Sequence, residues 1–138
     1  MAKIISWGIE YLINIPEIDD QHKEFVNIIN KLYWADEQKY PRDIGTRIVY
    51  ELLKYAEFHF VCEENTMMIY RYNGLTHQMD EHKRLLNVMK VKMNEFSAGK
   101  SDYDSIAKYA FMWLISHTVE EDKKFGIYYN ALKANPVG

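Results

Sequence analysis

Histidines are the residues of this chain whose chemistry is most informative, because imidazole can bind a metal, carry a proton or donate a hydrogen bond near neutral pH. The chain has five: His22, His59, His77, His82 and His117. All but His77 continue the apolar stripe of a separate amphipathic segment, and this phase predicts that they face a shared core. A satisfied core histidine would explain any single one of them. Inward histidines on four separate helices instead predict a metal site, since buried imidazole needs a partner.

Two carboxylates are spaced so that they can join these imidazoles. Glu63 follows His59 by four residues, a rotation of only about 40° on an ideal helix, so both side chains can point inward. Asp122 follows His117 by five residues, a rotation of about 140°, so it needs a helix end or a local distortion to reach the same place. Taken alone, each carboxylate would be a surface charge. Beside inward histidines, we expect both to be ligands.

This ligand set predicts a site for two metal ions. It is too large for one tetrahedral zinc ion, whereas imidazole and oxygen donors suit ions of iron or manganese character. Each carboxylate can bridge the pair while the imidazoles fill terminal positions. If the imidazoles divide unequally, one ion keeps an open position where a small ligand can bind.

Four helices must position these side chains. Asp19 or Asp20 is the expected N-cap of the first helix, Asn73-Gly74 is expected to break the second, and Gly126 is expected to end or bend the fourth. Short connections between amphipathic helices predict an all-α, up-down-up-down four-helix bundle in a single domain of residues 1–138. The expected segments are an irregular arm at 1–18, helices at about 19–38, 43–70, 77–97 and 102–124, and a short tail at 126–138.

Composition excludes several other classes. The chain has 138 residues, enough for one buried core, and a net charge of -3 that does not predict a nucleic-acid surface. It has no apolar run of the roughly 20 residues needed to span a bilayer. The single Cys62 cannot form an internal disulfide, and Met1 to Glu10 do not have the pattern of a secretory signal. We therefore expect a cytoplasmic protein with no nucleic-acid or membrane partner.

The order and spacing of these residues resemble the bacterial hemerythrins, from Trp7 to about Tyr129. The matching segments are Asp19-Asp20-Gln21-His22-Lys23, His59-Phe60-x-x-Glu63-Glu64-x-x-Met67, a histidine pair that ends at His82, and His117-x-x-x-x-Asp122. The resemblance implies a non-haem di-iron centre, with His22 and His59 on a coordinatively open iron. It places His82, His117 and one further histidine on a saturated iron. Glu63 and Asp122 would bridge the two irons, together with a solvent-derived oxo or hydroxo group.

The resemblance also implies reversible dioxygen binding, for carriage, storage or delivery, rather than enzymatic catalysis. A weak peroxidase or oxidase side activity is compatible with such a centre, and a dioxygen-consuming enzyme is a candidate partner. Leu114, one turn before His117, is the expected lining residue of the gas pocket, with plain core packing as the alternative. The rival function is a sensor of dioxygen, nitric oxide or iron, or a di-iron redox protein, built on the same centre.

The third helix departs from the family pattern. There the family has two histidines four residues apart, which would place the first at position 78, but this chain has Gln78 and carries His77 five residues before His82. On an ideal helix His77 would point about 140° away from His82. We expect an irregular or bulged start after Gly74 that still lets His77 bind. Otherwise Gln78 offers an amide oxygen or water fills the position, and with both irons open the chemistry would shift towards reacting with dioxygen.

Partners for the second nitrogen of each imidazole are expected among Gln21, Glu24, Glu51 and backbone carbonyls. Glu64 has the pattern of a surface charge, so Glu64→Ala is expected to leave metal binding unchanged. His59→Ala is expected to lose metal and to destabilise the bundle.

Two other classes fit the sequence poorly. A ferritin-like site needs Glu-x-x-His on two helices, and no histidine here has glutamate three positions before it. A metal-free bundle would bury several unligated imidazoles at a high cost in free energy.

Overall fold

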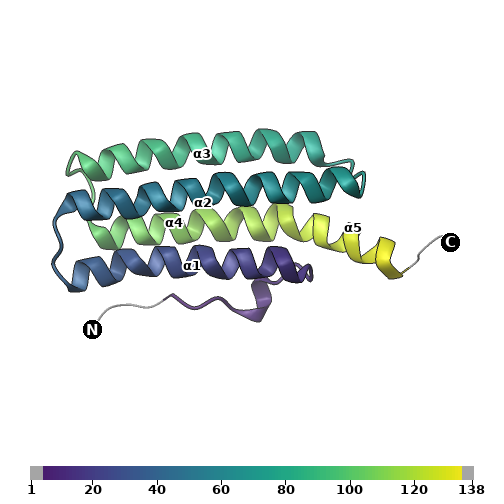
Figure 1. Ribbon diagram of the computed structural model, residues 1–138, viewed down its shortest axis with the longest axis horizontal. Helices are drawn as coiled ribbons and strands as arrows, with labels where there is room; N and C mark the ends of the chain where they lie inside the picture. The colour runs from purple at the N-terminus through teal and green to yellow at the C-terminus, as the bar shows by residue number, and fades with distance from the viewer. Residues whose placement is uncertain (1–4, 135–138) are drawn as a thin grey trace.

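Long antiparallel helices joined by short loops form the computed structural model of this protein, which describes residues 5–134 (Figure 1). Helix α1 packs on α2 and α4, and α3 packs on the same two helices. The predicted all-α, up-down-up-down bundle is therefore confirmed. The helices of the bundle are α1 (Pro16–Glu37), α2 (Arg42–Ile69), α3 (Leu75–Ser97) and α4 (Tyr103–His117).

Helix α1 begins earlier than the sequence predicts. Pro16 occupies its first turn after an extended Ile15, because proline has φ already set for a helix and lacks the N–H that a first turn leaves unpaired. The predicted N-cap at Asp19 or Asp20 is therefore wrong. Asp19 is buried within the helix, and its Oδ1 accepts a hydrogen bond of 2.8 Å from the backbone N–H of Ile13. This contact joins the N-terminal arm to α1.

From residue 5 to residue 15 the N-terminal arm lies along α1, and this described part is irregular apart from a single 3-10 turn, Ile9–Tyr11 (Figure 1). Asn30 on α1 holds it through two hydrogen bonds with the backbone of Ile5, of 2.8 and 2.9 Å. The indole of Trp7 packs beside the imidazole of His22, with 5.6 Å between ring centroids. The arm therefore covers one side of the predicted ligand His22.

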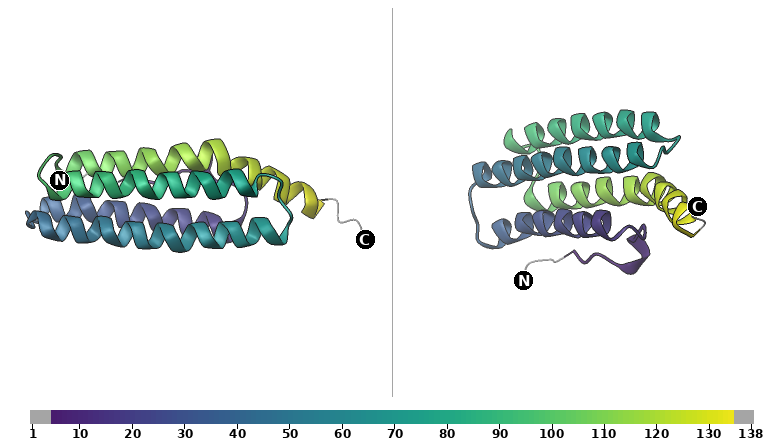
Figure 2. Two further views of the ribbon diagram at one scale, coloured as in Figure 1. Left: turned by 90° about the horizontal axis from the view of Figure 1, so that it is seen from above. Right: turned by 45° about the vertical axis from the view of Figure 1, so that its right-hand side comes forward.

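The fourth helix continues beyond its predicted end at residue 124. A π-helical segment, η2 (Thr118–Asp122), follows α4 and leads into α5 (Lys123–Ala134), which leaves the axis of α4 (Figures 1 and 2). Gly126 does not end the helix. A Cβ atom at this position would lie 2.2 Å from the carbonyl oxygen of Ile13, so glycine permits the arm to approach the helix. The expected tail is helical as far as residue 134, and its last four residues lie outside the described part.

Two apolar clusters make up the core, and a polar layer lies between them. The larger cluster contains Phe25 on α1 and Ala56 and Phe60 on α2, while the smaller contains Ile18 and Met67 near the other end of the same helices. Along the chain, His22 falls between Ile18 and Phe25, Glu63 falls between Phe60 and Met67, and His59 directly precedes Phe60. The polar layer is thus shielded from water along the bundle axis in both directions. None of the helices within residues 5–134 has the length and apolarity needed to cross a membrane.

Candidate metal centre

Six of the seven predicted ligands meet in the polar layer. Each helix of the bundle contributes one imidazole, α2 adds a carboxylate, and η2 adds a second. All six side chains are buried. They are His22, His59, Glu63, His82, His117 and Asp122.

These side chains form two ligand groups that share both carboxylates. The first group is His22, His59, Glu63 and Asp122, and the second is Glu63, His82, His117 and Asp122; within each, the ligand atoms lie within 4.8 Å of one another. Glu63 connects the groups through its two oxygens. Its Oε2 lies 3.4 Å from His59 Nε2 and 3.8 Å from His22 Nε2, whereas its Oε1 lies 3.2 Å from His82 Nε2.

Asp122, on η2 rather than α2, connects the same two groups. Its Oδ2 lies 3.2 Å from His22 Nε2, and its Oδ1 lies 3.2 Å from His117 Nε2. The predicted local distortion is present, since the wider i→i+5 turn of the π-helix Thr118–Asp122 brings a residue five positions after His117 back to the inward face. Each carboxylate therefore faces both ligand groups, which is the geometry that the expected bridging role needs.

The donor atoms fit a pair of cations. His59 Nε2, Asp122 Oδ2 and both oxygens of Glu63 are buried without a hydrogen-bond partner. Buried polar atoms are usually satisfied, and unpaired ones cost free energy. Imidazole nitrogens and carboxylate oxygens that converge in two groups are the donor set of iron and manganese sites. Bound metal ions would satisfy these atoms together.

The charges within the cluster stabilise one another strongly. Burial by itself would lower the pKa of His22, but the close carboxylates of Asp122 and Glu63, 3.2 and 3.8 Å from its Nε2, raise it to about 9. Burial opposes protonation of His117 too, yet the charge and hydrogen bond of Asp122 raise its pKa to about 9. For Glu63, burial would raise the pKa, but the charge of His59 and the close contacts with three imidazoles hold it well below its usual value. Without metal, protons therefore compensate the buried carboxylates.

Two of the four clustered imidazoles, those of His59 and His82, are oriented by a contact of Nδ1, the ring nitrogen that faces away from the ligand groups. His59 Nδ1 lies 2.6 Å from Gln21 Oε1, so Gln21 is a partner as predicted. His82 Nδ1 lies 2.6 Å from Glu64 Oε2, so the interpretation of Glu64 as a surface charge is wrong. The Glu64 side chain is only 19% exposed, because the residue after an inward Glu63 lies at the α2–α3 boundary. A partner on the neighbouring helix cannot be recognised from one sequence.

Glu24 and Glu51, the other expected partners, do not reach an imidazole. Glu24 accepts a hydrogen bond of 3.1 Å from Asn27 Nδ2, and Glu51 pairs with Lys31 at 2.7 Å. Both contacts lie on the exposed surface. These two glutamates therefore belong to the solvated face of the bundle.

The structure does not bring His77 into the cluster. Helix α3 is regular from Leu75, so the expected irregular start is not present and His77 points away from His82. Its side chain is 59% exposed, and its Nε2 lies 3.0 Å from Glu121 Oε2. Gln78 takes the inward position instead: it is 1% exposed, and its Nε2 donates a 3.3 Å hydrogen bond to Asp122 Oδ1. The expectation that His77 binds metal thus conflicts with the position of its ring.

A small cavity of about 10 Å³ adjoins the cluster. Enclosed spaces of this size are near the lower limit for one water-sized molecule, about 10–15 Å³. Leu114, the predicted pocket residue, lines it. Its remaining lining residues are His22, His59, Phe60, Leu85, Trp113, His117 and Asp122.

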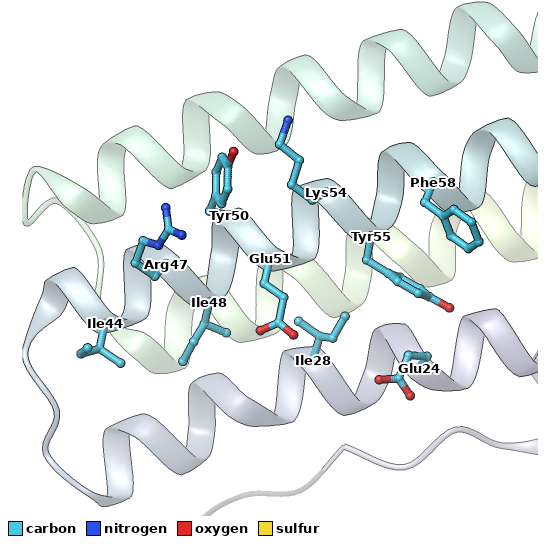
Figure 3. A pocket seen from close by; sticks show the side chains of 10 residues that line it. All are labelled: Glu24, Ile28, Ile44, Arg47, Ile48, Tyr50, Glu51, Lys54, Tyr55 and Phe58. Carbon is cyan, nitrogen blue, oxygen red and sulfur yellow. The ribbon is translucent and has the colours of Figure 1, made fainter.

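A larger hollow of about 740 Å³ lies elsewhere, between α1 and α2 (Figure 3). None of the six clustered side chains lines it. One of its lining residues, Tyr55, contacts the backbone beside the site: its hydroxyl donates a 3.2 Å hydrogen bond to the carbonyl oxygen of Gln21. The groove is therefore not an entrance to the ligand groups.

Comparison with known proteins gives a consistent result. The family model described as the hemerythrin HHE cation binding domain matches residues 14–126. A bacteriohemerythrin of Methylococcus capsulatus is 27% identical over 125 residues, which cover 89% of this chain and 95% of that protein. One from Clostridium acetobutylicum is 29% identical over 129 residues, covering 86% and 96%. A crystal structure of wild-type hemerythrin superposes with a TM-score of 0.76 at 26% identity, covering 90% of this chain and 96% of that one. This chain is a member of the hemerythrin HHE cation-binding family.

Proposed function

We propose that this protein binds dioxygen reversibly at a non-haem di-iron centre. In this proposal His22, His59, His82 and His117 are terminal ligands, and Glu63 and Asp122 bridge the irons. The observation that carries it is the pair of buried ligand groups that share both carboxylates, with a small cavity beside them. A ligand no larger than a diatomic gas suits its volume of about 10 Å³.

The His22 and His59 group supports an open position. It offers two imidazole nitrogens and one oxygen from each shared carboxylate, which leaves vacancies on an ion that takes six ligands. Both imidazoles also line the cavity. When bound, two irons supply the two electrons that dioxygen takes up on binding and returns on release.

The cavity wall keeps water and protons away from a bound gas. Phe60, Leu85, Trp113 and Leu114 are buried around it. The one N–H of the Trp113 ring is already donated to the carbonyl oxygen of Leu85 at 3.0 Å, so it does not point a proton at the ligand. Excluding water in this way disfavours side reactions, which favours release of intact dioxygen over irreversible oxidation.

The same argument supports carriage, storage or delivery rather than turnover as the physiological task. We propose that the protein acts in the cytoplasm, with a dioxygen-consuming enzyme as a candidate recipient. The single Cys62 and the mixed charge of the chain support this setting. The rival function is a sensor or redox protein that uses the same centre.

Spectroscopy of the iron-loaded protein tests the proposal. The reduced protein should contain two irons per chain, be nearly colourless, gain visible absorption in air and lose it under vacuum through repeated cycles. One irreversible conversion to the oxidised form would support the sensor or redox function instead. Purified protein that takes up no iron at all would rule out both.

A further inference from the structure

Gln78 lies beside the second ligand group, against Asp122, on the inward face of α3. It stands four residues before His82 on the regular helix α3, a rotation of only about 40°, so both side chains face the cluster. It is 1% exposed. Its Oε1 is buried without a hydrogen-bond partner. A buried amide oxygen beside a metal-ligand cluster therefore needs a partner.

The end of the Gln78 side chain already lies at ligand spacing. Nitrogen and oxygen donors about 2.1 Å from a first-row metal and at right angles to each other are about 3.0 Å apart. Gln78 Nε2 lies 3.3 Å from Asp122 Oδ1, and His117 Nε2 lies 3.2 Å from the same oxygen. The two ends of a carboxamide have nearly the same shape. A half-turn about the last side-chain bond therefore exchanges Nε2 for Oε1 at this position.

We propose that the carboxamide oxygen of Gln78 is a ligand of the metal held by His82 and His117. This inference rests on the proposed metal centre. With Gln78 the second ion has five protein ligands, whereas the His22 and His59 ion has four. With the solvent-derived bridge as its sixth ligand, the His82 and His117 ion is then saturated. Only the His22 and His59 ion keeps an open position, so dioxygen has one place to bind. Gln78 thus replaces the imidazole that the family has at this position.

Glu64 supports the same ion. An amide oxygen is a weaker donor than imidazole, and a carboxylate on the far nitrogen of a ligand histidine raises its basicity. His82 has this contact, at 2.6 Å, whereas His59 is paired with a neutral amide. The neighbouring His77 is not an alternative ligand, because its ring is exposed and paired with Glu121.

Release of Fe(II) to a chelator without dioxygen tests the proposal. Wild-type protein and the variants Gln78→Leu, Gln78→Glu and His77→Ala are loaded anaerobically with Fe(II), and the two release rates are measured. In Gln78→Leu, one iron should leave about tenfold faster or more, as expected when a metal site loses a supporting group. His77→Ala should match the wild type. Gln78→Glu should retain both irons, because its carboxylate keeps an oxygen ligand.

The glutamate variant separates two roles of Gln78. A carboxylate cannot donate a hydrogen bond to Asp122, so equally fast release from Gln78→Glu and Gln78→Leu would mean that Gln78 acts only as a donor, and would overturn the proposal. Wild-type rates in Gln78→Leu, or fast release from His77→Ala alone, would overturn it too. If Gln78→Leu does not fold, as judged by circular dichroism without metal, Gln78→Glu decides.

These outcomes are distinct from failure of the proposed function. The assay needs no dioxygen, so a wild-type chain that holds two irons but forms no reversible adduct leaves the Gln78 comparison intact. A wild-type chain that holds fewer than two irons refutes the di-iron centre itself.

Discussion

Glu64 provides the sharpest test of how the protein supports its metal ligands. Its Oε2 accepts a hydrogen bond from His82 Nδ1 at 2.6 Å, when that nitrogen carries the proton and Nε2 faces the metal. Hydrogen bonds to charged groups contribute about 1.5–3 kcal/mol, and neutral ones about 0.5–1.5 kcal/mol. Glu64→Gln keeps a neutral acceptor, so the expected loss is about 1–1.5 kcal/mol, or about tenfold in metal affinity.

Glu64→Ala removes the acceptor altogether and should cost more. The expected loss of metal affinity is about 10–100-fold, the range found when a group that orients a metal-bound histidine is removed. Partial exposure of Glu64, 19%, favours the lower part of that range because solvent screens the charge. This expectation reverses the sequence-based one, in which Glu64→Ala left metal binding unchanged.

The assay is anaerobic competition for Fe(II) against a chelator at pH 7, with thermal unfolding of the metal-free proteins measured in parallel. The matched control is Glu57→Ala on the same helix, since Glu57 pairs only with the exposed Lys54 at 3.4 Å among the contacts described. Equal metal affinity in Glu64→Ala and Glu57→Ala would refute the reasoning. A loss that appears equally in metal-free stability would show that Glu64 supports the fold rather than the metal.

Three further predictions concern protons, the cavity and the arm. Because the folded pKa values of His22 and His117 are raised to about 9 from 6.5, their stabilisation of the metal-free protein is complete below about pH 6.5 and is lost as pH rises through 9. The Tm of the metal-free protein should therefore fall over this window. Metal affinity should rise over the same window, and calorimetry in two buffers should detect proton release on metal binding. Leu114→Ala should lower stability by about 2–5 kcal/mol and admit water, so oxidation of the reduced protein in air, followed by absorption, should be faster than in the wild type; an unchanged rate would mean that Leu114 only packs. Gly126→Ala places a Cβ atom 2.2 Å from the carbonyl oxygen of Ile13, so the Tm should fall by several degrees, about what a loss of 1 kcal/mol or more causes, and an unchanged Tm would show that the arm can move away freely.

Much of the site could be predicted from residue spacing alone. His22, His59, His82 and His117 each continue an apolar helical stripe, and a repeat of about 3.6 residues sets which way a side chain points before any packing is known. The same arithmetic placed Glu63 beside His59. It also showed that Asp122 required a distorted helix, and the π-helix Thr118–Asp122 is that distortion. Local periodicity is a property of the chain, so the sequence determines it.

Contacts between helices were decided only by the tertiary structure. Glu64 meets His82 across the α2–α3 boundary, and no spacing within one helix encodes that distance. The choice between His77 and Gln78 depended on whether α3 starts regularly, which follows from how its first turn packs. Glycine is typical of helix ends, yet Gly126 lies within a helix and permits the close approach of Ile13, more than a hundred residues away in the sequence. Sequence spacing sets direction along one helix, whereas the partner that a side chain meets depends on how separate helices pack together.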